Sequence, residues 1–523
     1  MTDRTAPGTG HRTWTLVAVV LGSGIVFLDS TVVNVALRTM ADELPTTVVG
    51  ILEGQSYVVN GYLLTLAAFL VLAGALADRY GRRRMFVTGL AGFGAASLAC
   101  GLAPSMEILI LARLVQGLFG AILVPTSLAL INAAFSGPER GWAFGVWAAA
   151  TSALTLLGPP VGGFLVDSVG WQVAFFINVP LCALGVVVAA GRVAESRNPD
   201  APGRFDWLGA VAVALAVGGL AYGAIRGQEQ QWTDPVAWAA LGVGAVAAVS
   251  LVPLMTRRRD VLVPPHLFRS RNFTVTNLST LLIYGAIYLK YYVIAIFLQQ
   301  AFGYTALASG LALVPADVAL ILLSTRAGRL AGEHGPRRFM AAGPALMAAG
   351  LLWYLRLPAD SGSWAASFRD PATLVPPAGY LADILPAVTL FGIGLGIMVA
   401  PLTTALMTSV PTGNSGLASA INNAISRIGP ILASAVVFIA ISAAFYGGLQ
   451  ARLPGSDLDQ PSVRDEFAPL RIPDASSPER QDAAREASTD AFRLAMLIAA
   501  ILCASGAAVN WVGIRDEDAA EPG

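Results

Sequence analysis

The sequence predicts an all-α integral membrane protein in which two six-helix bundles are joined by an inserted helix pair, giving 14 transmembrane helices. The first observation is composition: 55% of the 523 residues are hydrophobic and 13% are charged, whereas soluble domains carry about 25% charged residues. The second is a series of fourteen apolar runs, each near the roughly 20 residues that a helix needs to cross a bilayer. The third is a turn that occurs once in each half of the chain.

The fourteen runs divide the chain into three regions. Residues 1–192 form an N-terminal six-helix bundle, 193–271 a linker with two extra transmembrane helices, and 272–523 a C-terminal six-helix bundle. The first run is longer than the apolar core of a signal peptide, about 7–15 residues, so it predicts an uncleaved first span. In order, the runs cover residues 14–36, 58–77, 85–103, 108–134, 143–166, 173–190, 208–225, 236–255, 275–298, 306–325, 340–357, 384–410, 418–446 and 491–512.

Arginine placement orients these spans. With the N-terminus in the cytoplasm, the cytoplasmic segments contain twenty arginines and the outer segments nine, in line with the excess of basic residues in cytoplasmic loops. We therefore expect both termini to be cytoplasmic. The longest outer loop, 449–490, contains Ser477 before Pro478, which predicts an N-capped short helix leading into the last span. This loop is expected to be a solvated connector or a lid over the outer mouth.

Composition excludes several classes of function. A formal net charge of zero argues against a nucleic-acid partner. The three cysteines (Cys100, Cys182 and Cys503) lie in apolar runs without the spacing of a disulfide framework or a metal cluster. An ATP-binding P-loop needs Gly-Lys-Ser/Thr, and the only lysine of the chain, Lys290, follows Leu289. The sequence therefore predicts no cofactor and no metal site.

The repeated turn relates the two bundles. GALADRYGRRRM follows the second run and GRLAGEHGPRRFM follows the tenth. The fifth and thirteenth runs likewise share a pattern, LGPPVGG and IGPILAS. Internal repeats around a central site are the architecture of secondary transporters. The two turns coincide at Gly74 and Gly328, Gly81 and Gly335, and Arg83 and Arg337.

Several motifs resemble those of one family. GALADRYGRRR is similar to the signature loop of the major facilitator superfamily, LARLVQGLFGA (111–121) to its span-4 motif, and GVWAAATSALTLLGPPVGG (145–163) to its span-5 antiporter motif, in which Leu154 replaces an internal glycine. LDSTVVNVAL (28–37), WQVAFFINVPL (171–181) and GLASAINNAISRIG (416–429) resemble the fourteen-span drug:proton antiporter branch. The resemblance covers nearly the whole chain and implies a major facilitator fold and multidrug or antibiotic efflux.

The signature loop predicts a gate at the cytoplasmic face. Its glycines permit close helix approach and a tight turn, and Asp78 can accept hydrogen bonds from arginines or from a facing helix end. The second half has Gly332 at the corresponding position, so we expect a stronger latch in the N-terminal half; plain positive-inside topology is the alternative. The gate residues are Gly74, Asp78, Arg79, Gly81, Arg82 and Arg83.

The span-5 motif predicts a kinked, closely packed helix, because proline interrupts the hydrogen-bond ladder and glycine lets neighbours approach. The resemblance implies a role in alternating access and in preventing leak, and simple close packing is the equally weighted alternative. The motif residues are Gly145, Gly158, Pro159, Gly162 and Gly163.

Four ionisable side chains lie inside apolar runs, where each costs at least about 2.5 kcal/mol: Asp29, Arg113, Lys290 and Asp317. A buried carboxylate that gains and loses a neighbouring cation as the protein moves can carry a proton. We expect Asp29 and Arg113 to be the proton-coupling pair, and Asp317 to be a second proton or cation site or else a capped structural acid. For Lys290 we expect a buried partner, Asp29 first and Asp317 second, over extension to the outer interface.

Substrate contacts are expected on aromatic and polar helix faces. Tyr284, Tyr288 and Tyr291 share one face of the ninth run at 100° per residue, and such faces suit flat amphipathic ligands. An aromatic seam between helices is the alternative. The candidate cavity residues are Asn34, Tyr62, Gln116, Tyr284, Tyr288, Tyr291, Asn422 and Asn423.

These features predict a monomeric secondary active transporter of the bacterial cytoplasmic membrane. It would export a hydrophobic or cationic small molecule, a drug or an endogenous antibiotic, in exchange for protons by alternating access. The alternative is a proton-coupled importer or lipid exporter of the same fold. A membrane sensor or enzyme is least favoured, because the spans hold no catalytic cluster and the chain no soluble signalling domain. The expected partners are the small-molecule substrate, protons and the lipid bilayer.

Overall fold

Long helices in two halves, with an extra helix pair between them in the sequence, make up the fold. The computed structural model describes residues 9–516 except 47–50, 199–204, 230–232, 258–260, 368–369 and most of 454–476. The N-terminal half comprises α1 (Thr9–Glu43), α2 (Ile51–Tyr80), α3 (Arg82–Gly101), α4 (Met106–Ala134), α5 (Gly137–Val169), α6 (Val173–Phe176) and α7 (Asn178–Arg192). The extra pair is α8 (Trp207–Glu229) and α9 (Pro235–Arg257). The C-terminal half comprises α10 (Arg271–Gln300), α11 (Ala306–His334), α12 (Arg337–Trp353), α13 (Leu385–Thr408), α14 (Ser415–Arg452) and α16 (Pro478–Gly513).

Short helical turns join some of these helices. One 3-10 turn occurs before α10, two between α12 and α13, and one before α14, and a π-helical turn leads directly into α13. Their bounds are η1 (Pro265–Arg269), η2 (Tyr354–Arg356), η3 (Pro371–Leu374), η4 (Tyr380–Ile384) and η5 (Thr412–Asn414).

Twelve helices in the described parts of the chain are long and apolar enough to cross a membrane. The sequence predicted fourteen. The two helices outside this set are α3, whose first turn holds three arginines, and α14, which carries Asn422, Asn423 and Arg427 in its first half. The described residues therefore support an all-helical membrane protein, and twelve of its predicted spans directly.

Two segments differ from the expected boundaries. The sixth predicted span is divided into the four-residue α6 and the longer α7. Most of the predicted outer loop 449–490 that the structure describes is helical, because α14 continues to Arg452 and α16 begins at Pro478. The expected short outer helix is the first part of α16 and runs without a break into the last span. Arg452 joins the two helices through Glu486 and Asp490, with nitrogen–oxygen distances of 2.8 Å to each.

Local sequence sets several helix ends. Ser105 and Thr305 are N-caps whose side chains accept hydrogen bonds from the backbone N–H of Ile108 and Ala308. Gly81, with φ of 110°, turns the chain between α2 and α3 in a conformation that disfavours side chains. These signals divide the apolar sequence into separate helices.

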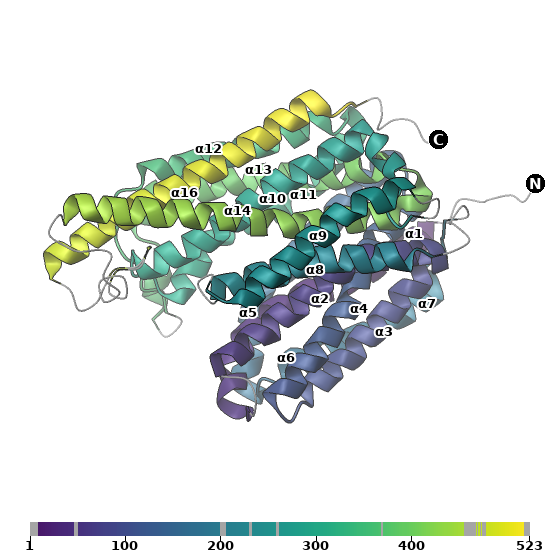
Figure 1. Cartoon of the computed structure of the whole chain (residues 1–523), viewed down its shortest axis with the longest axis horizontal. Helices are drawn as coiled ribbons and strands as arrows, with labels where there is room; N and C mark the ends of the chain where they lie inside the picture. Colours follow the sequence, from purple (N-terminus) through teal and green to yellow (C-terminus); the bar gives the residue numbers. More distant parts are fainter. Residues whose placement is uncertain are drawn as a thin grey trace, which may run out of the picture.

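The halves contact each other near one end of the molecule. Both α1 begins and α16 ends at this end, which we call the terminal end, and the two bundles lean apart toward the opposite, far end (Figure 1). At the terminal end α2 packs on α14, where a β-carbon on Gly74 would collide with the backbone of Gly416. On the other side α5 packs on α11, where a β-carbon on Gly141 would collide with Gly328. Glycines thus hold both contacts between the halves at backbone distance.

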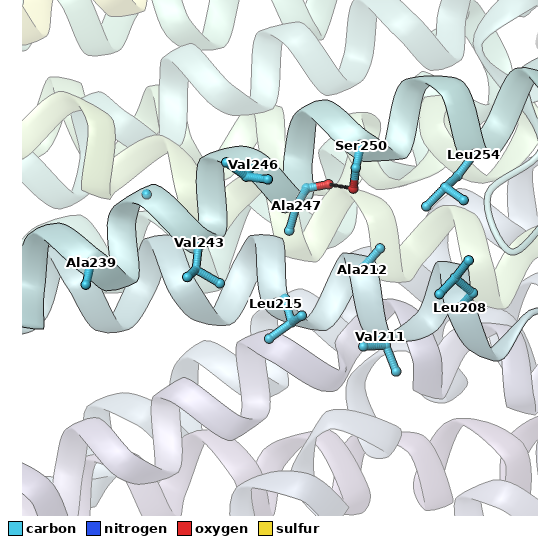
Figure 2. A pocket seen from close by; sticks show the side chains of 11 residues that line it. Leu208, Val211, Ala212, Leu215, Ala239, Val243, Val246, Ala247, Ser250 and Leu254 are labelled. Atoms are coloured by element: carbon cyan, nitrogen blue, oxygen red, sulfur yellow. Dashed lines mark hydrogen bonds between the residues drawn. The ribbon is translucent and has the colours of Figure 1, made fainter.

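The extra pair lies at the edge of the molecule. α8 packs on α2 and α9 packs on α8, with Gly219 and Gly244 at their crossing. Between the outward sides of α8 and α9 is an apolar groove of about 530 Å³. Figure 2 shows its lining, in which the one polar side chain, Ser250, donates a hydrogen bond to the carbonyl of Ala247. This apolar lining suits contact with lipid, and the lining residues include no charged side chain.

Candidate functional site

Asp29 is the centre of a buried polar cluster in the N-terminal half. Its side chain is 0% exposed on α1. The Nη1 group of Arg113, from α4, donates to Asp29 Oδ2 at 2.6 Å. Asp29 Oδ1 accepts from Gln116 Nε2 at 3.0 Å and from Asn178 Nδ2 at 2.8 Å. The carboxylate is therefore held by one cation and two amides from α4 and α7.

A second layer fixes the partners of Asp29. Ser97 Oγ, from α3, accepts from Gln116 at 3.2 Å and from Asn178 at 2.9 Å. Arg113 Nε donates to the carbonyl of Val58 at 3.0 Å, and its guanidinium lies 4.1 Å from the ring centroid of Tyr62. We call this set the Asp29 cluster: Asp29, Tyr62, Ser97, Arg113, Gln116 and Asn178.

The cluster corrects part of the expected substrate cavity. Tyr62 and Gln116 were expected to line the cavity, but they are 1% and 0% exposed and belong to the ion-pair network. Ser97 and Asn178 were missed. The signal for Asn178 was its place as an amide in the apolar run of the WQVAFFINVPL motif, whereas nothing distinguished Ser97 from other small helical residues.

The geometry of the cluster defines its chemistry. A buried ion pair is tolerated because each charge satisfies the other, and removing one charge leaves the partner uncompensated at a cost of about 3–5 kcal/mol. Protonation of Asp29 would therefore weaken its hold on Arg113 and force the guanidinium toward new partners. The Tyr62 hydroxyl is buried and has no hydrogen-bond partner among the described residues. The Asp29 cluster thus links α1, α2, α4 and α7 through one ion pair and its hydrogen bonds.

Lys290 does not pair with Asp29, which corrects the first expectation for this residue. Its side chain is 0% exposed on α10, and Nζ has no hydrogen-bond partner in the described structure. Nζ instead lies 4.0 Å from the ring centroid of Tyr291 and 4.7 Å from that of Phe391. Asp29 is unavailable because Arg113, on a neighbouring helix of its own bundle, already occupies it.

Asp317 is the acidic side chain that interacts electrostatically with Lys290. It lies half-buried on α11 and interacts electrostatically with Lys290 and with Tyr291, without a nitrogen–oxygen contact within 4.0 Å in the described residues. Tyr291 in turn packs edge-on against Phe391 of α13, with ring centroids 6.2 Å apart. The ammonium is therefore stabilised by aromatic faces and a distant carboxylate.

The signature loop forms a closed polar contact between the halves. Asp78 accepts from the backbone N–H groups of Gly416 at 3.0 Å and Leu417 at 2.8 Å, in the first turn of α14. Arg82 donates twice to Asp78 Oδ1, at 3.0 and 2.8 Å, and reaches the carbonyls of Thr412 and Gly413. Asp78 thus satisfies the free N–H groups of a facing helix while Arg82 satisfies its carboxylate.

The other gate residues lie at the rim of this contact. Arg83 and Arg84 donate their backbone N–H groups to Glu195, at 3.0 and 3.2 Å. Arg79 lies over the ring of Tyr80, with its guanidinium carbon 5.6 Å from the centroid. These contacts tie the signature loop to the segment after α7.

The second-half turn lacks such a carboxylate. A β-carbon on Gly332 would lie 2.8 Å from the Cα of Pro138, so the turn approaches the start of α5 by backbone packing. Arg337 donates its backbone N–H to Asp516 and its Nε to the carbonyl of Trp511, at 3.0 and 2.7 Å. The latch is therefore asymmetric in this structure, with the ionic contact on the side of Asp78.

The glycines of the span-5 motif face two different neighbours. A β-carbon on Gly145 would lie 2.6 Å from the carbonyl oxygen of Ser324 on α11, whereas one on Gly162 would lie 2.9 Å from Val32 on α1. Gly158 likewise meets Thr31 of α1, and Gly163 is less crowded. α5 therefore contacts the other bundle with its first half and its own bundle with its second. Pro159 lies within α5, and its side chain falls outside the described ones.

The departure from the span-5 motif has a structural counterpart. Leu154 packs so closely on α1 that a β-carbon on Gly24 would collide with it. The missing glycine of α5 is thus matched by a glycine on the facing helix, which keeps the two helices close.

The remaining cavity candidates are spread over several environments. Asn34 and Tyr288 are exposed, with Tyr288 at 44%. Asn422 is buried and donates to Asn277 and Thr280 on α10, at 3.1 and 2.8 Å, so it joins two helices of one bundle. Asn423 donates to the carbonyl of Ser419, and Tyr284 and Tyr291 are partly buried. The structure does not gather the eight candidates into one pocket.

The described residues contain no group of three or more His, Cys, Asp or Glu side chains placed to hold a metal ion.

Comparisons with known proteins agree with this architecture. The family model described as Major Facilitator Superfamily matches residues 19–434. The multidrug resistance protein Stp of Mycobacterium tuberculosis is 35% identical over 84% of this chain and 78% of its own length. The tetracenomycin C resistance and export protein of Streptomyces glaucescens is 30% identical over 83% of this chain and 76% of its own. The solved structure of the proton:xylose symporter XylE has the same fold, with a TM-score of 0.59 over 96% of this chain and 95% of that chain at 13% identity.

Proposed function

Because the chain belongs to the major facilitator superfamily, we propose that it is a secondary active transporter that exports a small organic molecule of the drug or antibiotic type in exchange for protons. Relatives at 30–35% identity carry names of multidrug resistance and of antibiotic resistance and export. The observation that carries the proton step is the fully buried pair of Asp29 and Arg113. We further propose that α3 and α14 also cross the bilayer, which makes fourteen spans.

Alternating access follows from where the halves touch. The arginine distribution assigns the terminal end to the cytoplasm, and both contacts between the bundles, α2 with α14 and α5 with α11, lie there. This state is therefore open toward the outside. A cytoplasm-facing state requires the Asp78 contact and the Gly145 contact to break and the far ends to approach.

The proton acts through the Asp29 cluster. In the outside-open state a proton taken up by Asp29 neutralises the carboxylate and weakens its bond to Arg113. The released guanidinium then favours a rearranged state in which the cluster can lose its proton to the cytoplasm. A substrate that stabilises the ionised carboxylate of Asp29 opposes binding of the proton there. Substrate and proton then bind in alternation.

Lys290 and Asp317 are proposed as a second charge site in the C-terminal half. An ammonium without a hydrogen-bond partner is costly inside a membrane protein, so a movement of α10 against α11 that brings Asp317 to Lys290 would stabilise another conformation. The pair thus contributes to which state is favoured at a given pH.

Proton release in vesicles tests the proposal. Purified protein in liposomes with an entrapped pH dye should move protons when ethidium or tetracenomycin C is added under a proton gradient. Asp29→Asn should lower this flux at least about tenfold, because the amide cannot take up the proton. Asp234→Asn, a partly buried acid before α9 that binds Arg226 rather than any residue of the Asp29 cluster, is the control and should retain the flux. Unchanged coupling in Asp29→Asn would remove Asp29 from the mechanism.

A further inference from the structure

Arg427 lies on the side of α14 that faces the N-terminal half. Gly416 and Ala420, in the first turns of α14, contact Gly74 of α2. Arg427 follows Ala420 by seven residues and Gly416 by eleven, so the three positions fall on one stripe of the helix at 100° per residue. Arg427 lies about 10 Å beyond Ala420 along α14, at 1.5 Å per residue. Its guanidinium therefore projects toward α2, at the level where the two bundles begin to diverge.

The guanidinium has tyrosines of both bundles within electrostatic range. Its charge acts on Tyr62 of α2 and on Tyr284 of α10. The antiparallel run of α2 and α14 agrees, because Tyr62 lies twelve residues before Gly74, about 18 Å along α2. Gly429, two residues after Arg427, packs on the carbonyl of Leu281 one turn before Tyr284. Arg427 is thus positioned between the halves at the level of both tyrosines.

Nothing in the described structure neutralises this charge. Arg427 is partly exposed and makes no ion pair, hydrogen bond or ring contact with the described residues. By contrast, Arg82 and Arg113, which are buried in the described structure, each bind a carboxylate. A cation that stays partly exposed in the middle of a membrane protein, unpaired, is available to a ligand from the space between the halves.

We propose that Arg427 binds an acidic group of the transported molecule, a carboxylate or an ionised phenol or enol on an aromatic framework. Arginine offers a planar fork of donors that matches a carboxylate in two hydrogen bonds. Tyr284 supplies an aromatic surface beside it. The preferred substrates are therefore flat organic acids.

This inference rests on the proposed function and adds a link to the proton step. The ring of Tyr62 covers the guanidinium of Arg113, which binds Asp29. The Arg427 charge also acts on Tyr62, so an anion held by Arg427 is within electrostatic range of this cluster, and its negative charge stabilises Arg113 in its present position. Protonation of Asp29 weakens the same arrangement, so acid and proton are bound in alternation.

Binding measurements with matched probes test the proposal without relying on transport. The probes are naphthalene, anthracene and pyrene, each carrying a carboxylate, the methyl ester of that carboxylate, or an alkylammonium group. Affinity for purified protein is read from probe fluorescence. The wild type should bind at least one carboxylate more tightly than its ester and its ammonium analogue. Arg427→Gln should weaken that carboxylate about 10- to 100-fold, the range of a charge-assisted hydrogen bond, and leave the ester within about threefold.

Two further variants make the result specific. Arg427→Lys should restore part of the preference for the acid, because it retains the charge without the planar fork. Arg226→Gln, at the turn between α8 and α9, removes an arginine that binds Asp234 and should leave all affinities unchanged. The proposal is overturned if no carboxylate is preferred by the wild type, or if Arg427→Gln weakens acid and ester equally. Since binding is measured at equilibrium, loss of proton coupling in Asp29→Asn would not produce either outcome.

Discussion

Lys290 is buried, and its Nζ has no hydrogen-bond partner in the described structure. The ammonium lies among Tyr291 and Phe391 at 0% exposure, and its nearest opposing charge is Asp317 on another helix. Aromatic faces compensate part of the charge, about 2 kcal/mol or more at desolvated sites, which is less than a direct carboxylate bond provides. Lys290 therefore favours a conformation other than this one, in which Asp317 is closer.

Lys290→Met tests this role with a side chain of similar length. Removing the unpaired charge should leave the unfolding temperature of the purified protein equal or higher, because no bond is lost. The pH profile of transport should shift toward alkaline pH, since loss of the nearby cation disfavours the ionised form of Asp317. Melting curves and vesicle transport across a pH series measure both effects. An unaltered pH profile would make Lys290 a packing residue.

At the residue scale, sequence reasoning identified charged groups better than their neighbours. Asp29 and Arg113 were expected to pair and are bonded in the structure, because both were rare charges in apolar runs and few partners were available. Tyr62 and Gln116 were assigned to the wrong environment, since the sequence does not show which helix lies against a polar side chain. The candidate sites did not include Arg427, because its lack of a partner is a property of the folded chain.

At the element scale, Asp78 of α2 caps the N-terminus of α14, a helix of the other half. Its carboxylate receives two backbone N–H groups and the Arg82 guanidinium, which is 2% exposed. A helix N-terminus carries partial positive charge, so one carboxylate stabilises a helix end and an arginine together. The contact between α2 and α14 is consequently both a helix cap and an ion pair.

Asp78→Asn should abolish efflux while the protein remains in the membrane. The amide leaves Arg82 buried without a carboxylate, at a cost of about 3–5 kcal/mol to the closed contact. Transport per amount of membrane protein is the measurement. Arg84→Gln, whose side chain is 75% exposed at the same turn, should transport normally. Full efflux by Asp78→Asn would restrict the signature loop to a topological role.

At the scale of the whole molecule, α2, α5, α11 and α14 carry the most extensive contacts between the halves, and α4 and α13 add smaller ones. α5 and α14 each touch the other bundle with the part near the terminal end and their own bundle farther along. Such helices transmit a change at one contact to the other, because their two ends belong to different neighbours. The proposed rocking of the bundles would separate the glycine contacts at Gly74 and Gly145 together with the Asp78 contact.

Gly145→Val should shift the protein toward the opposite state. A β-carbon there lies 2.6 Å from backbone atoms of Ser324 and Thr325, which cannot yield without moving α11 away. Spin labels on Leu102→Cys and Gly362→Cys, at the far ends of the two halves, should report a shorter mean distance in Gly145→Val. Gly310→Val on α11, where no atom lies within 4 Å of the added β-carbon, is the control. Equal distances in both variants would exclude α5 from the rocking contact.

The fold was largely predictable and its contacts were not. Apolar runs and the repeated turn were sufficient for the helices, because a bilayer admits few alternatives. The helix start at Pro478 was predicted from Ser477 and Pro478, whereas the division at Asn178 and the extension of α14 to Arg452 were missed, since they involve the Asp29 cluster and ion pairs between distant helices. Glycine pairs such as Gly141 and Gly328 become meaningful only when both helices are in place.

The inserted pair determines on which side of the membrane the C-terminal bundle begins. α8 and α9 run in opposite directions and follow each other closely in the sequence, with Gly219 and Gly244 at their crossing. A hairpin adds an even number of crossings, so the chain leaves it on the side of the membrane where it entered. The C-terminal bundle therefore keeps the orientation that pairs α11 with α5 and α14 with α2. An insertion of one helix would have inverted that bundle, which explains why an extension at this point comes as two helices.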